Sequence, residues 1–408
     1  MGDEWKKVQL DEIATISSGK RPAKVSKQPT EECAVPVIGG GGISGYTNRA
    51  LWEEDVLITG RVGTLGKLFA TSYPCWPSDN TLVIHMSEAN IDGAYLRYAV
   101  ELSIPQVAAM NRGAANPLIT QGDIGRLNIP LPPLTEQHAI AHILGSLDDK
   151  IELNQQMSQT LESIARAIFK SWFVDFDPVK AKMEGKQPEG MTEEIAALFP
   201  DRLVDSELGM IPEGWSPIPL SKMANFLNGL ALQKYPPIGK DDLPVLKIAQ
   251  LRSGKLDYDK LASNEISDKY LVSEGDLIFS WSGSLIVDVW AGPKCALNQH
   301  LFKVTPEKWA TKGLLWVAIH EHIDNFRAIA AAKAVTMGHI KRSHLNEAMV
   351  ILPSIEKVQN ISGVLDILIQ RSTTLKAESN TLINLRDTLL PQLISGKIRL
   401  NQPEDAAA

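Results

Sequence analysis

The sequence contains few cysteines and no long apolar run. Its three cysteines, Cys33, Cys75 and Cys295, are scattered along 408 residues. This number and spacing exclude a disulfide framework and are typical of a protein of the reducing cytoplasm. No apolar run reaches the roughly 18 residues that a membrane-spanning helix needs, and the first residues, MGDEWKKVQL, do not resemble a signal peptide. We therefore expect a cytoplasmic protein without membrane contact.

An excess of basic residues is also missing. Lys and Arg together number 41 against 48 Asp and Glu, which gives a formal net charge of −7. This balance argues against nucleic-acid binding, which usually shows as a basic domain, although local clustering counts for more than the sum. A chain of 408 residues is too long for a single core, so we expect two or three domains.

Motifs for catalysis, nucleotides and metals are incomplete. The segment Gly60–Lys67 resembles a phosphate-binding loop, but its first glycine is one residue out of place and Leu68 replaces the required Ser or Thr. His138 and His142 have the spacing of two zinc ligands on a helix, yet no third ligand lies nearby in the sequence. A plain turn and solvated histidines are the better interpretations. We therefore predict no catalytic residue and no metal site.

The sequence does contain a long heptad repeat, from about Glu136 to Phe173. It follows two consecutive prolines, has Thr135 as a candidate N-cap and ends before Pro178. An average apolar period of 3.5 predicts a helix that packs lengthwise against another helix. The two columns of this predicted seam are Ile140, Leu147, Asn154, Leu161 and Ile168, and Leu144, Ile151, Ser158, Ala165 and Trp172.

A second heptad repeat lies 221 residues further on, between Glu356 and Leu390, and is followed by Pro391. Two matching repeats in one chain favour an intramolecular coiled coil over two unrelated surface helices. The polar seam residues Asn154, Ser158 and Ser372 are of the kind that fixes register at some cost in stability. The columns of the second seam are Ile361, Leu368, Leu375, Leu382 and Leu389, and Leu365, Ser372, Ser379, Arg386 and Leu393.

The segments before each long helix also match. Short β-branched runs alternate with glycine-rich turns and one or two helices, which predicts two α/β or α+β globular domains of duplicated origin. The matched pairs include Trp5 with Trp215, Gly19 with Gly229, 36–38 with 244–246, 54–58 with 275–279, 79–84 with 298–304, and the helices 94–102 with 314–323. The predicted boundaries are a first globular domain 1–134, a first long helix 135–177, a linker 178–212 rich in Lys, Glu, Pro and Gly, a second globular domain 213–353, and a second long helix with its tail 354–395.

Several loops in both halves carry cations and no acid. Loops of this kind can contact phosphates through Lys and Arg, and bases through Asn, Gln, Arg and Ser. Ordinary solvated loops are the alternative for any one of them, but their recurrence in both halves favours a shared surface. Trp281 is either a stacking residue or part of the core. The candidate DNA-binding residues are Lys20, Arg21, Arg61, Lys67, Asn111, Arg112 and Asn116 in the first half, and Ser282, Ser284, Lys333, Thr336, His339, Lys341 and Arg342 in the second.

Four phrases carry a resemblance to a known family. They are 129–137 (IPLPPLTEQ), 172–178 (WFVDFDP), 205–215 (DSELGMIPEGW) and 389–396 (LLPQLISG). With the two repeats in this order, the chain resembles the DNA-specificity (S) subunit of type I restriction–modification enzymes over nearly its whole length. One departure is Lys357-Val358, which stands where the first copy has Glu136-Gln137.

The resemblance implies a non-catalytic subunit that binds double-stranded DNA. Each globular domain would be a target-recognition domain for one part of a two-part asymmetric sequence, and the long helices would form an antiparallel pair that sets the spacer. It also implies two modification (methyltransferase) subunits as partners and, through them, restriction subunits. S-adenosylmethionine, ATP and Mg would belong to those partners, and this chain itself would bind no cofactor.

The helix pair is the surface on which the resemblance implies that the modification subunits dock. Phe169, Trp172 and Phe173 are candidates for that contact, with packing against the chain's own domains as the alternative. Two other classes remain open on the sequence. One is a non-catalytic coiled-coil scaffold with two ligand-binding domains, which the negative net charge favours; the other is a nuclease or methyltransferase with a divergent site.

Overall fold

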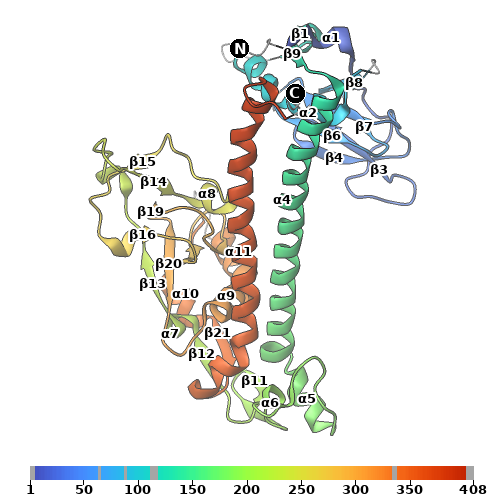
Figure 1. Cartoon of the computed structure of the whole chain (residues 1–408). Helices are drawn as coiled ribbons and strands as arrows, with labels where there is room; N and C mark the ends of the chain where they lie inside the picture. The colour runs from blue at the N-terminus through green and yellow to red at the C-terminus, as the bar shows by residue number, and fades with distance from the viewer. Residues whose placement is uncertain (1–4, 63–65, 87–89, 111–117, 333–337, 401–408) are drawn as a thin grey trace, which may run out of the picture. The chain divides into compact units, whose positions relative to one another are not determined.

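A computed structural model describes residues 5–62, 66–86, 90–110, 118–332 and 338–400 (Figure 1). The chain forms two compact units. Unit 1 comprises Met1–Asp149 and Ile383–Ala408, and unit 2 comprises Lys150–Leu382. Each unit contains one globular half and the adjoining parts of both long helices. Among the described helices, none has both the length and the apolar composition that crossing a bilayer requires.

The first globular half, in unit 1, contains three small sheets. The four-stranded sheet is antiparallel throughout and has the order β2 (Ala14–Ser18), β8 (Thr81–Met86), β5 (Val56–Gly60) and β6 (Leu68–Thr71). The next sheet has the order β4 (Gly42–Thr47), β3 (Val35–Gly39) and β7 (Trp76–Pro77), with β3 and β7 parallel. The third sheet pairs β1 (Lys6–Gln9) with β9 (Asn128–Leu131). The helices are α1 (Leu10–Ile13), α2 (Gly93–Met110) and α3 (Gln121–Gly125).

The second globular half, in unit 2, contains corresponding sheets. One has the antiparallel order β13 (Ala224–Asn228), β20 (Leu301–Pro306), β17 (Leu277–Ser280) and β18 (Val287–Val289). Another has the order β15 (Leu261–Ala262), β14 (Leu243–Leu246), β19 (Cys295–Leu297) and β16 (Leu271–Val272), with β14 and β19 parallel. A third sheet pairs β12 (Ser216–Pro219) with β21 (Met349–Leu352). The helical segments are α7 (Leu220–Met223), η2 (Leu232–Lys234), α8 (Ile248–Ser253), η3 (Asp268–Tyr270), α9 (Lys312–Ala332) and α10 (Arg342–Glu347).

The two halves share one topology, which confirms the duplication and the α+β class predicted from the sequence. The order β2-β8-β5-β6 corresponds to β13-β20-β17-β18, and the pair β1-β9 corresponds to β12-β21. Each half also has one parallel pair, β3 with β7 and β14 with β19. Strand pairing joins segments that are far apart in the sequence, so the same order in both halves indicates a duplicated domain.

Two long helices, α4 (Leu134–Phe169) and α11 (Ile355–Ile394), lie side by side and run antiparallel (Figure 1). Asp148 contacts Arg386 in unit 1 and Ser158 contacts Ser372 in unit 2, so the partner's number falls as the number along α4 rises. These contacts confirm the predicted coiled coil. Seam residues also enter the core of each unit, because Ile140 and Leu144 of α4 are completely buried in unit 1, and Ile361 and Leu365 of α11 are completely buried in unit 2.

The ends of α4 differ from the prediction. The Pro133 carbonyl accepts the N–H groups of Glu136 and Gln137, so Thr135 lies within the first turn and is not the N-cap. At the other end α4 passes into a π-helical turn, η1 (Lys170–Val174), and the chain turns at Phe176, which has a left-handed φ of 57°. Pro178 does not end α4; it occupies the start of the next helix, α5 (Asp177–Met183), where proline loses no hydrogen bond.

The segment 178–212, expected to be a linker, has secondary structure of its own. It contains α5, α6 (Glu193–Ala196), and a hairpin of β10 (Leu203–Ser206) and β11 (Gly209–Pro212). Val179 and Phe199 are buried in the core of unit 2, and the Phe199 ring lies 5.7 Å from that of Trp215. A few apolar anchors therefore order a segment whose composition predicted only a linker between the halves.

Asn154 is a buried polar residue of the seam within unit 2. Its side chain is completely buried, and neither its amide oxygen nor its amide nitrogen has a hydrogen-bond partner among the described residues. Burying an amide without partners costs about 1–3 kcal/mol. We expect Asn154→Leu to raise the free energy of unfolding by about 1–3 kcal/mol, measured by denaturant titration. Gln155→Leu, at an exposed position of α4, is the control; a less stable Asn154→Leu protein would contradict the expectation.

Candidate nucleic-acid interface

The candidate site of each half lies where β2 and β5, or β13 and β17, end on either side of the start of β8 or β20. Glycines follow β2 and β13: the Gly19 N–H donates to the Thr81 carbonyl at 3.1 Å, and the Gly229 N–H donates to the Leu301 carbonyl at 3.0 Å. A Cβ atom on Gly19 would lie 2.1 Å from the Ser78 carbonyl oxygen, and one on Gly229 would meet a backbone oxygen at 2.2 Å. Only glycine allows this close approach.

Arg61 and Trp281 occupy the same backbone position in the two halves. Each directly follows the central strand, β5 or β17, and each carbonyl accepts an N–H from an isoleucine, Ile119 at 2.9 Å and Ile340 at 3.0 Å. The next residues make matching isolated bridges, Val62 with Leu118 and Ser282 with His339. This structural equivalence was not recognised from the sequence, because an arginine and a tryptophan show no similarity.

The side chains at this position make equivalent contacts with different chemistry. A guanidinium nitrogen of Arg61 donates to the Ser18 hydroxyl at 3.3 Å, and Trp281 Nε1 donates to the Asn228 amide oxygen at 2.9 Å. Ser18 and Asn228 are the last residues of β2 and β13. One framework therefore presents a cationic hydrogen-bond donor in the first half and an aromatic ring in the second.

In the first half, further polar groups surround Ser18. Gln121, on α3, donates its amide N–H to the same Ser18 hydroxyl at 3.1 Å. Lys20 and Arg21 follow Gly19, and both are exposed, as is Lys67. None of these three cations, nor Arg61, forms an ion pair within the part of the chain that the structure describes. They are therefore available to phosphate groups. The candidates Asn111, Arg112 and Asn116 lie outside the described residues.

In the second half, one candidate is buried, whereas others lie at the surface. Ser282 is 3% exposed, and its hydroxyl hydrogen-bonds His300 Nδ1 at 2.9 Å. It therefore holds His300 in place and does not present a free hydroxyl. Ser284, His339 and Lys341 are exposed. Lys333 and Thr336 lie outside the described residues.

At the end of β17, Trp281 packs among aromatic rings, and Arg342 lies beside one of them. Arg342 is exposed, but its guanidinium donates to the Phe226 carbonyl at 2.8 Å and lies 5.6 Å from the Phe302 ring centroid. Trp281 is half-buried, 5.8 Å from the His300 ring and 6.2 Å from the His339 ring. His300 and Asn228 were not predicted as site residues, although His300 lies within the matched segment 298–304.

The three aromatic candidates for partner contact lie in the chain's own core. Phe169 and Phe173 are each 2% exposed and Trp172 is 8% exposed. Phe169 stacks on Phe173 at 5.2 Å, and Trp172 meets the ring of Phe199 edge-on. The alternative left open on the sequence, packing within the chain, is therefore what the structure shows. These rings offer almost no surface to a partner.

An apolar stripe on α4 is exposed instead. Leu153, Met157 and Ile164 are 50%, 39% and 42% exposed. Their spacings of four and seven residues place them on one line along the helix. This line is hard to recognise in the sequence, because the heptad pattern of the seam on the same helix is stronger. Exposed apolar groups in a row on a helix are typical of a docking surface.

His138 and His142, which have the spacing of two zinc ligands, are not joined by a third metal-ligating side chain among the described residues. His138 lies 3.6 Å from Asp92 at an exposed position. His320 packs against Trp316, and burial lowers its pKa to about 4, so it is neutral at physiological pH. No group of three or more metal-ligating side chains gathers among the residues whose positions are described.

Comparisons with known proteins identify the family. The family described as "Type I restriction modification DNA specificity domain" matches residues 2–163 and 212–385, which include both globular halves. The chain belongs to this family. It is a specificity subunit of a type I restriction–modification system.

Relatives along most of the chain agree. The chain is 26% identical over 340 residues to the type I restriction enzyme HindI specificity subunit of Haemophilus influenzae, covering 72% of this chain and 74% of that one. It is 21% identical to the EcoBI specificity subunit of Escherichia coli, covering 97% and 86%. The crystal structure of the type I restriction–modification S subunit from M. genitalium has a TM-score of 0.57 and 16% identity and covers 97% of both chains, which shows the same fold.

Proposed function

We propose that each globular half reads one part of a two-part DNA sequence at the strand ends that hold Arg61 and Trp281. The observation that carries this proposal is the shared backbone position with different side chains. Two domains with one framework dock on DNA in the same way, while an arginine and an indole select different bases. A bidentate arginine favours guanine, whereas an indole with its N–H engaged offers apolar and stacking contact.

Exposed cations around these strand ends support a role in phosphate contact. Lys20, Arg21 and Lys67 in the first half and Lys341 in the second are exposed. Contacts of this kind position a protein on the duplex without reading sequence. They also release counterions, so affinity for DNA falls steeply with salt. If the chain were a scaffold that does not bind DNA, no such salt dependence would be measured. The net charge of −7 is the same under both functions, so it does not separate them.

The helix pair completes the proposal. We infer that it sets the unread spacer between the two half-sites and carries two methyltransferase subunits, through which restriction subunits join. The chain itself is then non-catalytic and acts in the cytoplasm, where the target DNA is. The exposed stripe of Leu153, Met157 and Ile164 is the surface of α4 best suited to the methyltransferase contact.

The test is to sequence methylated adenines in DNA from cells that carry this chain with its methyltransferase subunit, against cells that lack the chain. We expect a gapped two-part motif only when the chain is present. A complex that assembles and is active but methylates without such a motif would contradict the proposal. DNA binding that does not weaken with salt would favour the scaffold.

The stripe makes a separate prediction. We expect Met157→Glu to weaken association with the methyltransferase subunit by about tenfold or more, because a carboxylate would be buried against an apolar partner. Titration calorimetry of the purified proteins measures this change. Gln155→Glu, an exposed substitution of the same charge on the same helix, is the control. Equal weakening by both variants would indicate a general charge effect rather than docking on the stripe.

A further inference from the structure

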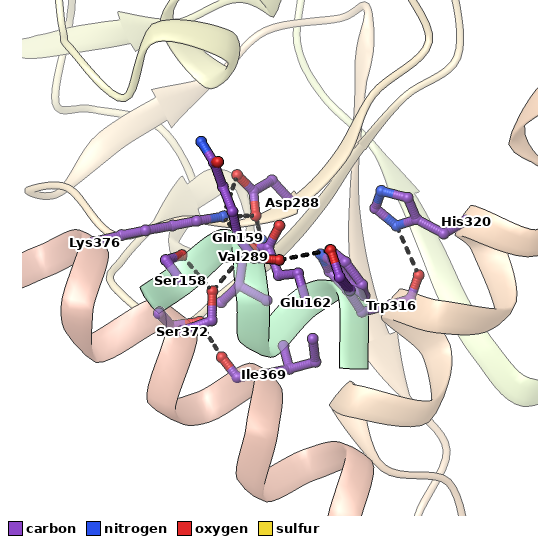
Figure 2. A network of polar contacts seen from close by, with 12 residues as sticks. Ser158, Gln159, Glu162, Asp288, Val289, Trp316, His320, Ile369, Ser372 and Lys376 are labelled. Carbon is purple, nitrogen blue, oxygen red and sulfur yellow. Dashed lines mark hydrogen bonds and ion pairs between the residues drawn. The ribbon is translucent and has the colours of Figure 1, made fainter. Parts of the chain in front are cut away.

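A partly buried ionic junction in unit 2 joins three elements of the chain (Figure 2). The Lys376 ammonium, on α11, lies 2.7 Å from a carboxylate oxygen of Glu162 on α4 and 2.7 Å from one of Asp288 on β18. Ser372 donates to the same Glu162 oxygen at 2.8 Å and hydrogen-bonds Ser158 at 2.7 Å. The junction therefore ties both long helices to one strand of the second globular half.

Solvent reaches this junction poorly. The side chains of Lys376, Asp288 and Glu162 are 30%, 27% and 19% exposed. Burial raises the pKa of the Asp288 carboxyl, and the neighbouring ammonium opposes this rise. Ion pairs in such surroundings need close geometry and further hydrogen bonds to offset their desolvation. The arrangement therefore favours one relative position of α4, α11 and β18 over slightly shifted positions.

The strand that carries Asp288 leads directly to the candidate DNA-binding loop. Asp288 faces Ile278 across the pair of β18 and β17, and β17 runs into Trp281. The loop is closed by the hydrogen bond from the Ser280 N–H to the Ile286 carbonyl at 2.8 Å. A second contact from α11, the Asn380 amide to the Ala291 carbonyl at 3.0 Å, follows β18. The loop 281–286 is thus held on the helix pair through a short, hydrogen-bonded strand pair.

Unit 1 has a junction of the opposite polarity. There one carboxylate, Asp148 of α4, lies between two guanidinium groups, Arg97 of α2 at 2.9 Å and Arg386 of α11 at 2.8 Å. Tyr98 donates to the same carboxylate at 2.7 Å. Each globular half is therefore linked to both long helices by ion pairs, through α2 in unit 1 and through β18 in unit 2.

We propose that Lys376, with Glu162 and Asp288, is a positioning junction that fixes the second DNA-binding loop on the helix pair and thereby fixes the spacer between the half-sites. The inference rests on the proposed function. Lys376 touches no DNA; it acts through Asp288 and the strand pair that ends at Trp281.

The experiment measures binding of the complete complex with its methyltransferase subunits to DNA duplexes that carry the target with its natural spacer or with one base pair more or less. We expect the wild type to prefer one spacer strongly. In Lys376→Met the ratio of the affinity for the natural spacer to that for an altered spacer should fall by about tenfold. Lys376→Arg keeps the charge and should retain the wild-type ratio. Lys150→Met is the control, because Lys150 forms an exposed pair with Glu378 at 3.5 Å.

A second variant covers the case in which Lys376→Met does not fold. The triple variant Glu162→Gln, Asp288→Asn and Lys376→Met leaves no unpaired charge, and replacing a complete buried ion network is often tolerated. It should fold and show the same loss of spacer preference. A folded variant with the wild-type preference would overturn the role of the junction. A wild-type complex without any preferred spacer would overturn the proposed function instead.

Discussion

Arg61→Ala should weaken binding of the assembled complex to its target DNA by about 10- to 100-fold and relax selectivity at the first half-site. The Arg61 guanidinium is held at the end of β5 by its hydrogen bond to Ser18 at 3.3 Å. An arginine fixed in this way meets a base edge with little further loss of side-chain entropy. Selectivity at the second half-site should not change, because no part of that site is altered.

The measurement is a binding titration at one fixed salt concentration against duplexes with every base substituted in turn. Arg61→Lys separates charge from geometry, since lysine keeps the phosphate attraction but lacks the planar fork. We expect Arg61→Lys to bind DNA but to lose discrimination. Lys7→Ala removes the same charge from an exposed position on β1 and is the control. Unchanged affinity and selectivity in Arg61→Ala would remove this residue from the site.

The helical framework followed from the sequence because its signal is periodic and local. Seam positions such as Leu144, Ile361 and Leu365 recur at fixed spacings, and burial of those positions is the physical cause of the pattern. The duplicated sheets followed from strand segments that match in the same order along the two halves. These features depend on residue type and spacing, which one sequence shows directly.

Helix ends were less predictable from the sequence, because a proline does not always end a helix. Helix α2, expected to end at Leu102, continues through Pro105, and α11 continues through Pro391 to Ile394. In α2 the neighbouring Ile104 and Val107 are buried in the core, so packing offsets the lost hydrogen bond. In α11 the proline lies in the last turn, where few hydrogen bonds remain to be lost.

The candidate site could be predicted only in part, because its contacts join distant segments. Charge and loop position pointed to Arg61 and Lys20, but the bond from Arg61 to Ser18 spans 43 residues. Ser282 shows the limit of residue type as a guide: a serine in a loop next to exposed residues is buried against His300. The ionic junctions were invisible for the same reason, since Asp288 and Lys376 are 88 residues apart.

The one departure from the family phrase has a structural explanation. Gln137 donates its side-chain amide to the Pro132 carbonyl at 2.9 Å and accepts the Asp92 N–H at 2.9 Å, which joins α4 to the segment before α2. The corresponding Val358 of α11 is completely buried among apolar side chains. The same helix start is thus fixed by hydrogen bonds in one half and by apolar packing in the other.

Inserting one heptad into each long helix, after Asp149 in α4 and after Leu382 in α11, should lengthen the preferred spacer. Both insertions lie at the boundary between the units, so each unit keeps its internal contacts. Seven residues add about 10 Å of helix, which corresponds to about three base pairs. Three added base pairs also rotate the second half-site by about a quarter turn or more around the DNA axis. Length and rotation therefore conflict, and we expect a preferred spacer that is longer by about one to three base pairs.

Binding to the natural spacer should fall by about a hundredfold in this variant, because one half-site is no longer reached. The measurement compares duplexes in which the spacer is extended one base pair at a time. A heptad inserted in α4 alone is the control; it shifts the register of Ser158 against Ser372 and should destabilise unit 2 without selecting a longer spacer. If the variant with both insertions folds and keeps the natural spacer, the helices do not set the distance between half-sites. Reading of the two half-sites would then have to be coupled by the methyltransferase subunits.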